Sequence, residues 1–381
     1  MKRILLDARY LDGSFSGIAT YSRCLLEHLA QVDKENHYQV IVRPSFNGDI
    51  QLGENFELLS WKPRPISLQT VIRLHDFTNE LNPDIFHALH PMTPVFHEGN
   101  MMVTVHDMQP FTDPNFHGRR LRPIRNLYRN FYRWAYPNAF SRAKWILCVS
   151  YATRDDMARL LPGTVPKLVV VPSGLEVPLE EPLDDEYVQS VLTKHDLRGP
   201  YLIYYGSTRP NKNLPNMVRA FSRLRAENPR GEGPRDLTLV LVVRRDRFFR
   251  DVERVIQHEG LGEAVKVLPP VSQKNKQVLL KSAAAMAFVT KHEGFGFPPL
   301  EAMAAGVPVV AGKSGSLPEV LGSAAQWADP EDPADMAAAF AEVLDNEKLR
   351  ARLIKRGHER AGAFSWTDAA LRVRDIYNLL F

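Results

Sequence analysis

The chain has 381 residues, of which 44% are hydrophobic and 24% are charged, with a formal net charge of +4 at pH 7. These ordinary globular proportions exclude wholesale disorder, and the length suits two α/β domains of about 150 to 200 residues each. Because the positive balance is mild, the position of the basic residues matters more than their number.

The two cysteines, Cys24 and Cys148, lie in apolar runs far apart in the sequence, with no Cys-x-x-Cys pair and no histidine at metal-ligand spacing. They indicate buried thiols in a reducing compartment, so the cytoplasm is the expected location. The first three residues lead into a short strand rather than a signal peptide, and no run reaches the roughly 20 apolar residues that a membrane span needs.

The first 150 residues alternate between short strands and helices. The opening strand, within residues 2–11, runs through a glycine turn with Gly13 and Gly17 into an amphipathic helix. The turn matches neither the dinucleotide fingerprint GxGxxG nor the phosphate loop GxxxxGK[ST]. Short apolar runs bounded by Pro, Gly or Asn predict further strands, at 38–44, 56–61, 85–90, 101–105 and 145–150.

Histidines follow or lie in two of these strands. His106 and Asp107 come just past the carboxyl end of the strand at 101–105, the edge of an α/β sheet at which ligands bind. The imidazole could donate to or accept from a sugar hydroxyl, or it could be satisfied by neighbouring backbone. His87 and His90 share a strand face, but no third ligand is near, so a metal site is not expected there.

Residues 119–144 are strongly basic and contain no acidic residue. Apolar and aromatic side chains recur at helical spacing on one face, and four arginines occupy much of the remainder: Arg122, Arg125, Arg129 and Arg133. Such a helix could lie on an anionic membrane, or its apolar face could be core with the arginines solvated. Nucleic-acid binding would also need a recognised module, and none is present, so no nucleic-acid partner is expected.

Between about residues 172 and 198, Pro, Gly and acidic residues replace the periodic pattern, which is typical of an interdomain linker. The sequence of strand, glycine turn and helix then restarts at 201–224. This second turn carries Arg209 and Lys212 near the helix start. Two cations there could neutralise a diphosphate and stabilise it as a leaving group, whereas a solvated loop is the alternative.

The most informative stretch is 291–312, in which Glu293 and Glu301 flank a Gly-Phe-Gly turn and the pair Pro298-Pro299. The pattern predicts strand, loop, helix and strand, since the prolines suit a first helical turn. Free N–H groups at such a helix start form an anion site, and a glutamate on each side could accept hydrogen bonds from hydroxyls. An anion with hydroxyls on both sides describes a nucleotide sugar. Alternatively, the glycines merely turn the chain and the glutamates are solvated.

With VTVHD, GSTRPNKN and HEGFGFPPLEAMAAGVPVV followed by SGSLPEVLG, the chain resembles the retaining glycosyltransferases of family four. The resemblance covers nearly the whole length, and its most specific part is the E-x7-E pair. It implies an α/β protein of the GT-B fold, with two facing Rossmann-like domains and a cleft between them. The N-terminal acceptor-side domain would comprise 1–180 plus 365–381, and the donor-binding domain 199–364.

The resemblance also implies roles in the second domain. Glu301 would bind the ribose hydroxyls of the donor nucleotide, and Glu293 would face the donor sugar. Phe295 and Gly296 would offer backbone N–H groups to sugar or phosphate.

Further roles concern the two glycine turns and the histidine. Arg209 and Lys212 match the family's basic pair on the diphosphate, Gly17 its phosphate-facing N-terminal loop, and His106 a residue that meets the donor sugar across the cleft. Many members place an arginine directly after the glycine of the second turn, where this chain has Ser207 and carries its arginine two residues later, at Arg209.

No Asp-x-Asp occurs in the sequence, so the usual carboxylate site for a metal on the diphosphate is missing and protein cations must balance that charge. A metal-independent transferase without a cofactor is expected. The resemblance implies front-face attack, in which the leaving phosphate takes the proton of the acceptor. Glu293 would then orient the sugar rather than act as a base.

The motifs FHALHP, VTVHDMQP and GSTRPNKNL look most like the branch that transfers mannose in surface polysaccharide or O-antigen assembly, with GDP-mannose as donor and a glycan or lipid-linked acceptor. A lipid-linked acceptor would fit a peripheral position on the inner face of the cell membrane. Two rivals remain: a non-catalytic nucleotide-sugar-binding protein, and a GT-B enzyme of another reaction such as a phosphorylase. A Rossmann oxidoreductase is disfavoured by the missing GxGxxG.

Overall fold

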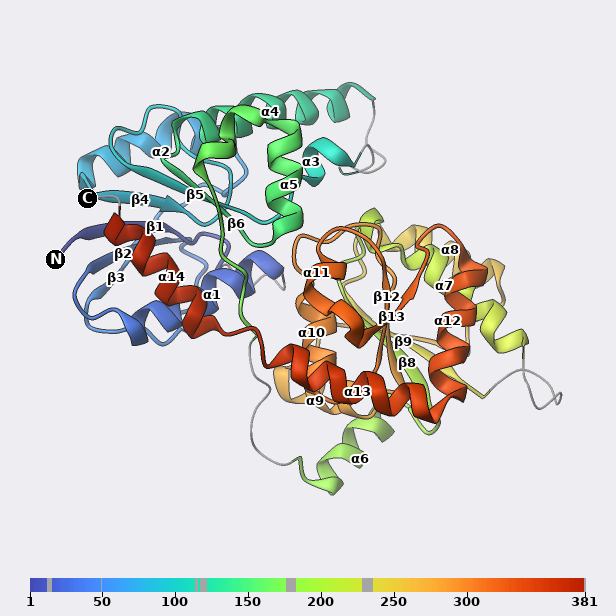
Figure 1. Cartoon of the computed structure of the whole chain (residues 1–381). Helices are drawn as coiled ribbons and strands as arrows, with labels where there is room; N and C mark the ends of the chain where they lie inside the picture. The colour runs from blue at the N-terminus through green and yellow to red at the C-terminus, as the bar shows by residue number, and fades with distance from the viewer. Residues whose placement is uncertain are drawn as a thin grey trace. The chain divides into compact units, whose positions relative to one another are not determined.

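A computed structural model describes residues 1–11, 16–48, 50–113, 116, 122–175, 183–227 and 236–379. Gly13 of the first glycine turn lies outside these ranges, and so does the side chain of Arg122. The chain forms two compact units: unit 1 is Met1–Gly174 with Ser365–Phe381, and unit 2 is Leu175–Phe364. Figure 1 shows that each unit is a sheet with helices packed around it.

Unit 1 contains seven parallel strands in the order β3-β2-β1-β4-β5-β6-β7. Strands β4 and β5 are buried along their whole length, as expected where helices cover both faces of a parallel sheet. The described strands are β1 (Arg3–Asp7), β2 (His37–Val42), β3 (Phe56–Ser60), β4 (Ile85–Ala88), β5 (Met101–Val105), β6 (Trp145–Cys148) and β7 (Leu168–Val170). The described helices are α1 (Gly17–Val32), α2 (Leu68–Leu81), α3 (Gln109–Thr112), α4 (Arg122–Arg142), α5 (Tyr151–Leu160) and α14 (Trp366–Leu379).

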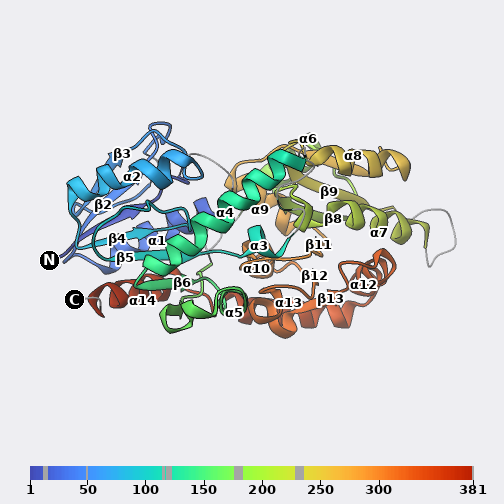
Figure 2. The ribbon, with the colours of Figure 1, turned by 90° about the horizontal axis from the view of Figure 1, so that it is seen from above.

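The C-terminal helix α14 belongs to unit 1, where it packs against α1 (Figures 1 and 2). Trp366 at its start is buried and meets the ring of Tyr21 from α1 edge to face, with ring centroids 5.5 Å apart. Near its end, Tyr377 bonds to His87 of β4. Gly174 accommodates the helix start, because a Cβ there would collide with the backbone of Trp366.

Unit 2 contains six parallel strands in the order β10-β9-β8-β11-β12-β13. The described strands are β8 (Tyr201–Gly206), β9 (Thr238–Val243), β10 (Val265–Leu268), β11 (Ala285–Phe288), β12 (Val309–Gly312) and β13 (Ala325–Ala328). The described helices are α6 (Asp185–Lys194), α7 (Leu214–Ala226), α8 (Phe249–His258), α9 (Gln273–Lys281), α10 (Phe297–Ala304), α11 (Leu317–Leu321), α12 (Pro333–Asp345) and α13 (Glu347–Ala361).

The two sheets reverse their strand order at equivalent places, between β1 and β4 in unit 1 and between β8 and β11 in unit 2. In open α/β sheets, ligands bind beyond the carboxyl ends of the strands at such a switch point. The residues that follow these four strands are therefore the first place to look for a site in each unit.

The region 172–198 is not wholly a linker. It contains α6, which packs on α9. Helix α6 begins after Asp184, and the Asp184 side chain accepts a hydrogen bond from the Tyr187 backbone N–H. Asp184 caps this helix, and Asp185 and Glu186 lie in its first turn, where negative charge interacts favourably with the helix dipole.

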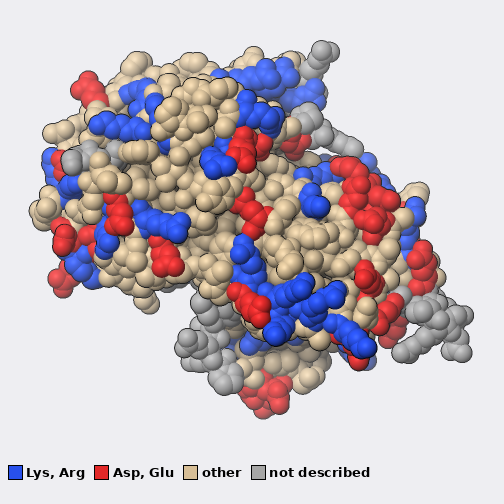
Figure 3. Space-filling model, viewed as in Figure 1, with Lys and Arg blue, Asp and Glu red and all other residues tan. Residues whose placement is uncertain are grey.

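The face of helix α4 that packs on the core is not the apolar face predicted from its sequence pattern. Its buried side chains come from its C-terminal half: Tyr132, Ala135, Tyr136, Ala139 and Phe140. The apolar stripe identified in the sequence is largely exposed, with Leu127 69% exposed and Trp134 46% exposed. Arg129 and Arg133 are exposed beside it, and Figure 3 shows basic side chains gathered over α4 at the top of the view. Phe131 of this stripe packs against the core, but Ile124, Leu127, Tyr128 and Trp134 are exposed, so these four do not form core as the core-facing alternative required.

Candidate functional site

The turn after β8 brings Lys212 to the switch point of unit 2. Pro210–Lys212 form a single 3-10 turn, and Asn213 follows it in the left-handed region at φ 59°. The Asn213 side-chain amide donates to the backbone oxygens of Val289 (3.1 Å) and Pro330 (2.7 Å). Since Val289 directly follows β11, these bonds fix the turn against the neighbouring strand.

Lys212 and Glu293 form an ion pair at this point. The Lys212 Nζ donates to both carboxylate oxygens of Glu293, at 2.8 and 2.6 Å. The Lys212 side chain is 18% exposed and the Glu293 side chain is 8% exposed, so the pair is mostly buried but still reached by water. The lysine ammonium also lies 5.9 Å from the ring centroid of Phe288. The ion pair thus places an ammonium group and a carboxylate together at the carboxyl edge of the sheet.

The loop that carries Glu293 is fixed from two sides. The Ser316 hydroxyl donates to the backbone oxygens of Glu293 (3.1 Å) and Phe295 (2.9 Å). Gly315 has φ 54°, and a Cβ there would lie 2.5 Å from the Glu293 oxygen. A glycine at this position thus permits the close approach of two backbone segments.

Gly296 is the N-cap residue of α10 and adopts φ 105°, which strongly favours glycine. A Cβ at this position would also lie 2.7 Å from the side chain of Leu317. No side chain caps the start of α10, and Pro298 and Pro299 lie in its first turn. The buried Phe295 precedes Gly296 and packs edge to face on Phe364, with ring centroids 5.5 Å apart.

Glu301 on α10 has two partners that the sequence did not indicate. The Tyr205 hydroxyl donates to Glu301 Oε2 at 2.7 Å, and the Lys276 Nζ from α9 donates to the same oxygen at 2.5 Å. Burial and the charge of Glu301 raise the pKa of Tyr205 well above its usual value, so this phenol remains a donor. Lys276 stands in an ordinary polar helix sequence, and no motif distinguishes it.

The other residues predicted in this turn lie at its surface. Arg209 is exposed, and its backbone oxygen accepts from the Lys212 N–H at 2.9 Å. Ser207 is half-buried, and its backbone oxygen accepts from the Tyr204 hydroxyl at 2.7 Å. The structure thus brings Lys212 and Glu293 together and sets Glu301 on the helix that follows, while Arg209 and Ser207 shape the turn.

In unit 1, His106 follows β5 and is half-buried. Its Nε2–H donates to the backbone oxygen of Leu89 at 2.8 Å. Its ring packs edge to face on the ring of Tyr21, with ring centroids 4.8 Å apart. Burial lowers the pKa of His106 to about 4, so the ring is neutral at pH 7. With Nε2 protonated, Nδ1 is the acceptor of this ring.

Gly17 is the exposed first residue of α1, directly after the N-cap Ser16, whose hydroxyl accepts from the Ala19 N–H at 3.2 Å. Three of the four arginines of α4 have described side chains, and Arg125 is half-buried whereas Arg129 and Arg133 are exposed. No helix within the described ranges is long and apolar enough to cross a membrane.

The switch point of unit 1 holds an ion pair that sequence reasoning missed. Arg9 and Asp7, at the end of β1, are both fully buried, and the Arg9 Nε and Nη2 donate to the two carboxylate oxygens at 2.7 and 2.6 Å. His90 Nε2 lies 3.3 Å from Asp7 Oδ2. Burial alone would raise the pKa of Asp7, but the charge and hydrogen bonds of Arg9 hold it far below its usual value.

His87 and His90 do not share a strand face, because β4 ends before His90. His87 is buried and contacts the hydroxyls of Tyr377 (2.7 Å) and Thr104 (2.8 Å). Burial lowers its pKa to about 3. Among the described residues, no three His, Cys, Asp or Glu side chains are grouped so as to hold a metal ion.

Two doubly wound parallel units, with paired charges beyond the strand ends of each, define a protein of the GT-B class. Residues 15–177 match the family described as glycosyltransferase family 4, and residues 190–360 match glycosyl transferases group 1. The chain belongs to these glycosyltransferases, as its sequence motifs predicted.

Similar curated proteins include mannosyltransferases. The chain is 29% identical over 281 residues to the O-antigen chain mannosyltransferase B of Escherichia coli, covering 73% of this chain and 70% of that one. It is also 29% identical over 236 residues to the MMP alpha-(1->4)-mannosyltransferase of Mycolicibacterium hassiacum, covering 61% of this chain. That match spans only 53% of the mycobacterial protein's own length.

Solved structures share the fold over the full length. Sucrose-phosphate synthase of Thermosynechococcus elongatus superposes with a TM-score of 0.79 at 19% identity, covering 100% of this chain and 99% of that one. HepE of Anabaena, solved in complex with UDP and glucose, superposes with a TM-score of 0.75 at 16% identity, covering 99% and 100%. These likenesses confirm the predicted GT-B fold.

Proposed function

We propose that this glycosyltransferase is a retaining, metal-independent mannosyltransferase that uses GDP-mannose and a glycan or lipid-linked acceptor. The observation that carries the proposal is the pair of lysine–carboxylate contacts in unit 2, Lys212 with Glu293 and Lys276 with Glu301. The choice of mannose follows the names of the relatives from Escherichia coli and Mycolicibacterium hassiacum.

Each side chain in unit 2 has a proposed part in binding the donor. Glu301 accepts hydrogen bonds from the ribose hydroxyls, with Tyr205 and Lys276 fixing its carboxylate. Lys212, with Arg209, neutralises the diphosphate, while Phe295 and Gly296 offer backbone N–H groups. Because Lys212 already bonds to Glu293, donor binding exchanges part of that contact for phosphate oxygens.

In the proposed reaction, the bond between the anomeric carbon and the diphosphate oxygen breaks as the acceptor hydroxyl oxygen bonds to that carbon on the same face. The hydroxyl proton passes to the leaving diphosphate. Glu293 orients the sugar, and the neutral His106 accepts a hydrogen bond from a sugar hydroxyl through Nδ1. Positive charge from Lys212 stabilises the departing diphosphate, so no protein nucleophile or metal is required.

The exposed stripe of α4 supports a peripheral membrane contact. Leu127 and Trp134 present apolar surface beside the exposed Arg129 and Arg133, the combination that binds anionic lipid surfaces. Flotation with acidic and with neutral liposomes tests it: wild type should float with acidic liposomes only. The triple change of Arg125, Arg129 and Arg133 to Glu should remain in solution, and a wild type that remains in solution with both lipids would contradict the contact.

The function is tested by thermal-shift measurements with GDP, UDP and ADP sugars, followed by nucleotide release in the presence of EDTA. A bound donor should raise the unfolding free energy by about 2.7 kcal/mol at 100 times its Kd. GDP-mannose should give the largest shift, with release that requires an acceptor and persists in EDTA. A shift without release would instead favour a binding protein, and release that requires free phosphate would favour a phosphorylase.

A further inference from the structure

A cavity of about 360 Å³ lies in unit 1, and none of the residues with a proposed donor-binding role lines it. We call it the α2 pocket, after the helix that forms most of it. Its lining residues are Trp61, Pro63, Gln69, Arg73, Asp76, Phe77 and Glu80. The volume is at the small end of the range for ligand sites, which suits one or two sugar rings rather than a whole nucleotide.

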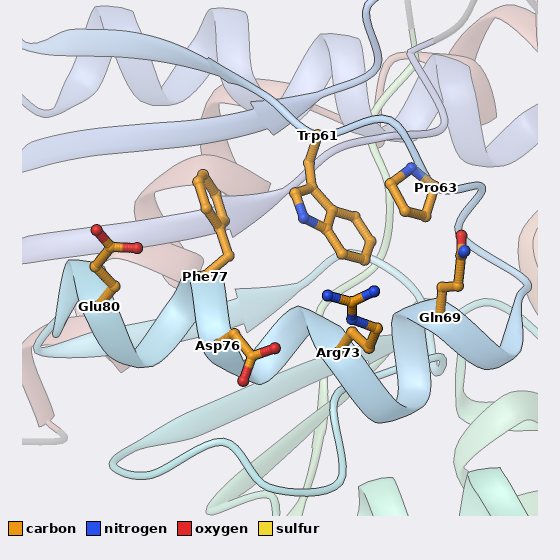
Figure 4. A pocket seen from close by; sticks show the side chains of 7 residues that line it. All are labelled: Trp61, Pro63, Gln69, Arg73, Asp76, Phe77 and Glu80. Atoms are coloured by element: carbon orange, nitrogen blue, oxygen red, sulfur yellow. The ribbon is translucent and has the colours of Figure 1, made fainter.

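The α2 pocket has an aromatic side and a polar side. Trp61 and Pro63 come from the segment after β3, and the other lining residues lie on one face of α2. Figure 4 shows the rings of Trp61 and Phe77 next to each other, with the side chains of Arg73 and Asp76 across from them. Both rings are half-buried, so each keeps part of its surface open to a ligand.

The aromatic wall is held in place by the buried ion pair at the switch point. The Arg9 guanidinium lies 4.7 Å from the Trp61 ring centroid, within the range of a cation–π contact. Arg9 Nη1 also donates to the backbone oxygen of Pro63 at 3.0 Å and to Thr70 Oγ1 at 2.9 Å. Since Asp7 fixes the guanidinium in turn, the indole is positioned before any ligand arrives.

The polar side determines which ligands fit. A pyranose has an apolar face of C–H groups that packs on an aromatic ring, and a rim of hydroxyls that donate and accept hydrogen bonds. Asp76 and Glu80 supply acceptors, and Arg73 and Gln69 supply donors; one Asp76 oxygen also lies 3.1 Å from His75 Nε2. Two carboxylates against one guanidinium disfavour an anionic sugar or a phosphate.

We infer that the α2 pocket binds a neutral pyranose of the acceptor glycan, at a subsite separate from the donor site. The inference rests on the proposed function, because a glycan acceptor is what brings such a sugar to this chain. Trp61 is the stacking platform, Asp76 and Glu80 select neutral over acidic sugars, and Arg9 is a positioning residue that touches no ligand.

The test titrates the full chain, without donor, with a neutral mannose trisaccharide and with a uronic acid trisaccharide, followed by saturation-transfer NMR. The neutral sugar should bind saturably, and the acidic one at least about tenfold more weakly. Trp61→Ala should weaken neutral binding about tenfold, whereas Tyr151→Ala, an exposed aromatic of the same unit outside the pocket, should not. Asp76 and Glu80 are exposed, so the double variant Asp76→Asn and Glu80→Gln should leave the core intact. In this variant the ratio of the Kd values for the acidic and the neutral trisaccharide should fall.

Three outcomes overturn the inference: no saturation up to about 20 mM neutral trisaccharide, unchanged neutral binding in Trp61→Ala with a wild-type melting temperature, or equal binding of both sugars. If Trp61→Ala is unstable, the double variant decides alone, and unchanged discrimination refutes the pocket. Donor turnover by the same preparation separates the two proposals. Transfer without trisaccharide binding refutes only the pocket. Trisaccharide binding that depends on Trp61, without transfer, refutes the proposed function and leaves the pocket as a site for a neutral sugar that is not an acceptor.

Discussion

The switch points of the two units carry the same kind of contact in opposite settings. In unit 1, Asp7 and Arg9 are fully buried, and the Arg9 guanidinium also donates hydrogen bonds to the Pro63 backbone oxygen and the Thr70 hydroxyl. In unit 2, Lys212 and Glu293 are partly open to water. A buried pair must keep its partners, since each charge left alone in the interior is costly. A partly open pair can exchange one partner for a ligand, so the first contact is suited to structure and the second to chemistry.

The largest effect expected from this comparison is on folding. Arg9→Met leaves the Asp7 carboxylate buried without its partner, so the free energy of unfolding should fall by about 3–5 kcal/mol. Urea unfolding followed by circular dichroism measures it. The double variant Asp7→Asn with Arg9→Met, which removes both charges, should recover part of the loss. A change below about 1 kcal/mol in the single variant would show that the pair is not structural.

The next effect is on catalysis. Lys212→Ala removes one preorganised charge, so the transition-state stabilisation measured from kcat/KM should fall by about 2–4 kcal/mol. Because this change also leaves the nearly buried Glu293 carboxylate without its partner, the melting temperature is measured alongside kcat/KM to separate a loss of stability from a loss of catalysis. Lys291→Ala is a matched control, as its ion pair with Glu331 is more exposed. An unimpaired Lys212→Ala enzyme would remove the lysine from the mechanism.

Acid should weaken unit 1 by a smaller amount. Burial lowers the folded-state pKa of His87 to about 3, below the unfolded value of about 6.5. The unfolded chain therefore binds more protons in this window, and the free energy of unfolding falls as the pH falls from 6.5 towards 3. Between pH 6.5 and 5.5 the loss should be about 1 kcal/mol for this histidine. His87→Gln should flatten the pH dependence of urea unfolding by that amount, and an unchanged slope would contradict the assignment.

The smallest effect is expected for Glu293→Gln. The amide keeps an oxygen for Lys212 and for a sugar hydroxyl but cannot take a proton. Turnover should therefore stay within about tenfold of wild type at saturating donor. A loss of several orders of magnitude, with normal donor affinity in the thermal shift, would make Glu293 a base and overturn its role as a sugar-orienting residue.

The α/β class could be predicted because strands and glycine turns leave local signals, and the GT-B fold was implied by the resemblance of the motifs around Lys212 and Glu293 to family four glycosyltransferases. Strand order leaves none, and it is adjacency of β8 and β11 that lets Lys212 reach Glu293, 81 residues further along the chain. The linker prediction missed α6 because an acidic N-terminal turn resembles a loop in composition. An apolar stripe on α4 could not reveal whether it faces core or solvent, since periodicity gives a face but not its partner.

The sequence by itself determined the chemistry available at the strand ends, because Glu293, Glu301 and Lys212 stand in motifs with their own glycine and proline geometry. Tertiary structure alone decided the partners: Lys276 for Glu301, and Arg9 for Trp61. Side-chain contacts across elements depend on strand order and helix placement, which no short stretch of sequence encodes. For the same reason, only burial in the tertiary structure distinguishes the partly exposed pair Lys212–Glu293 in unit 2 from the fully buried pair Arg9–Asp7 in unit 1.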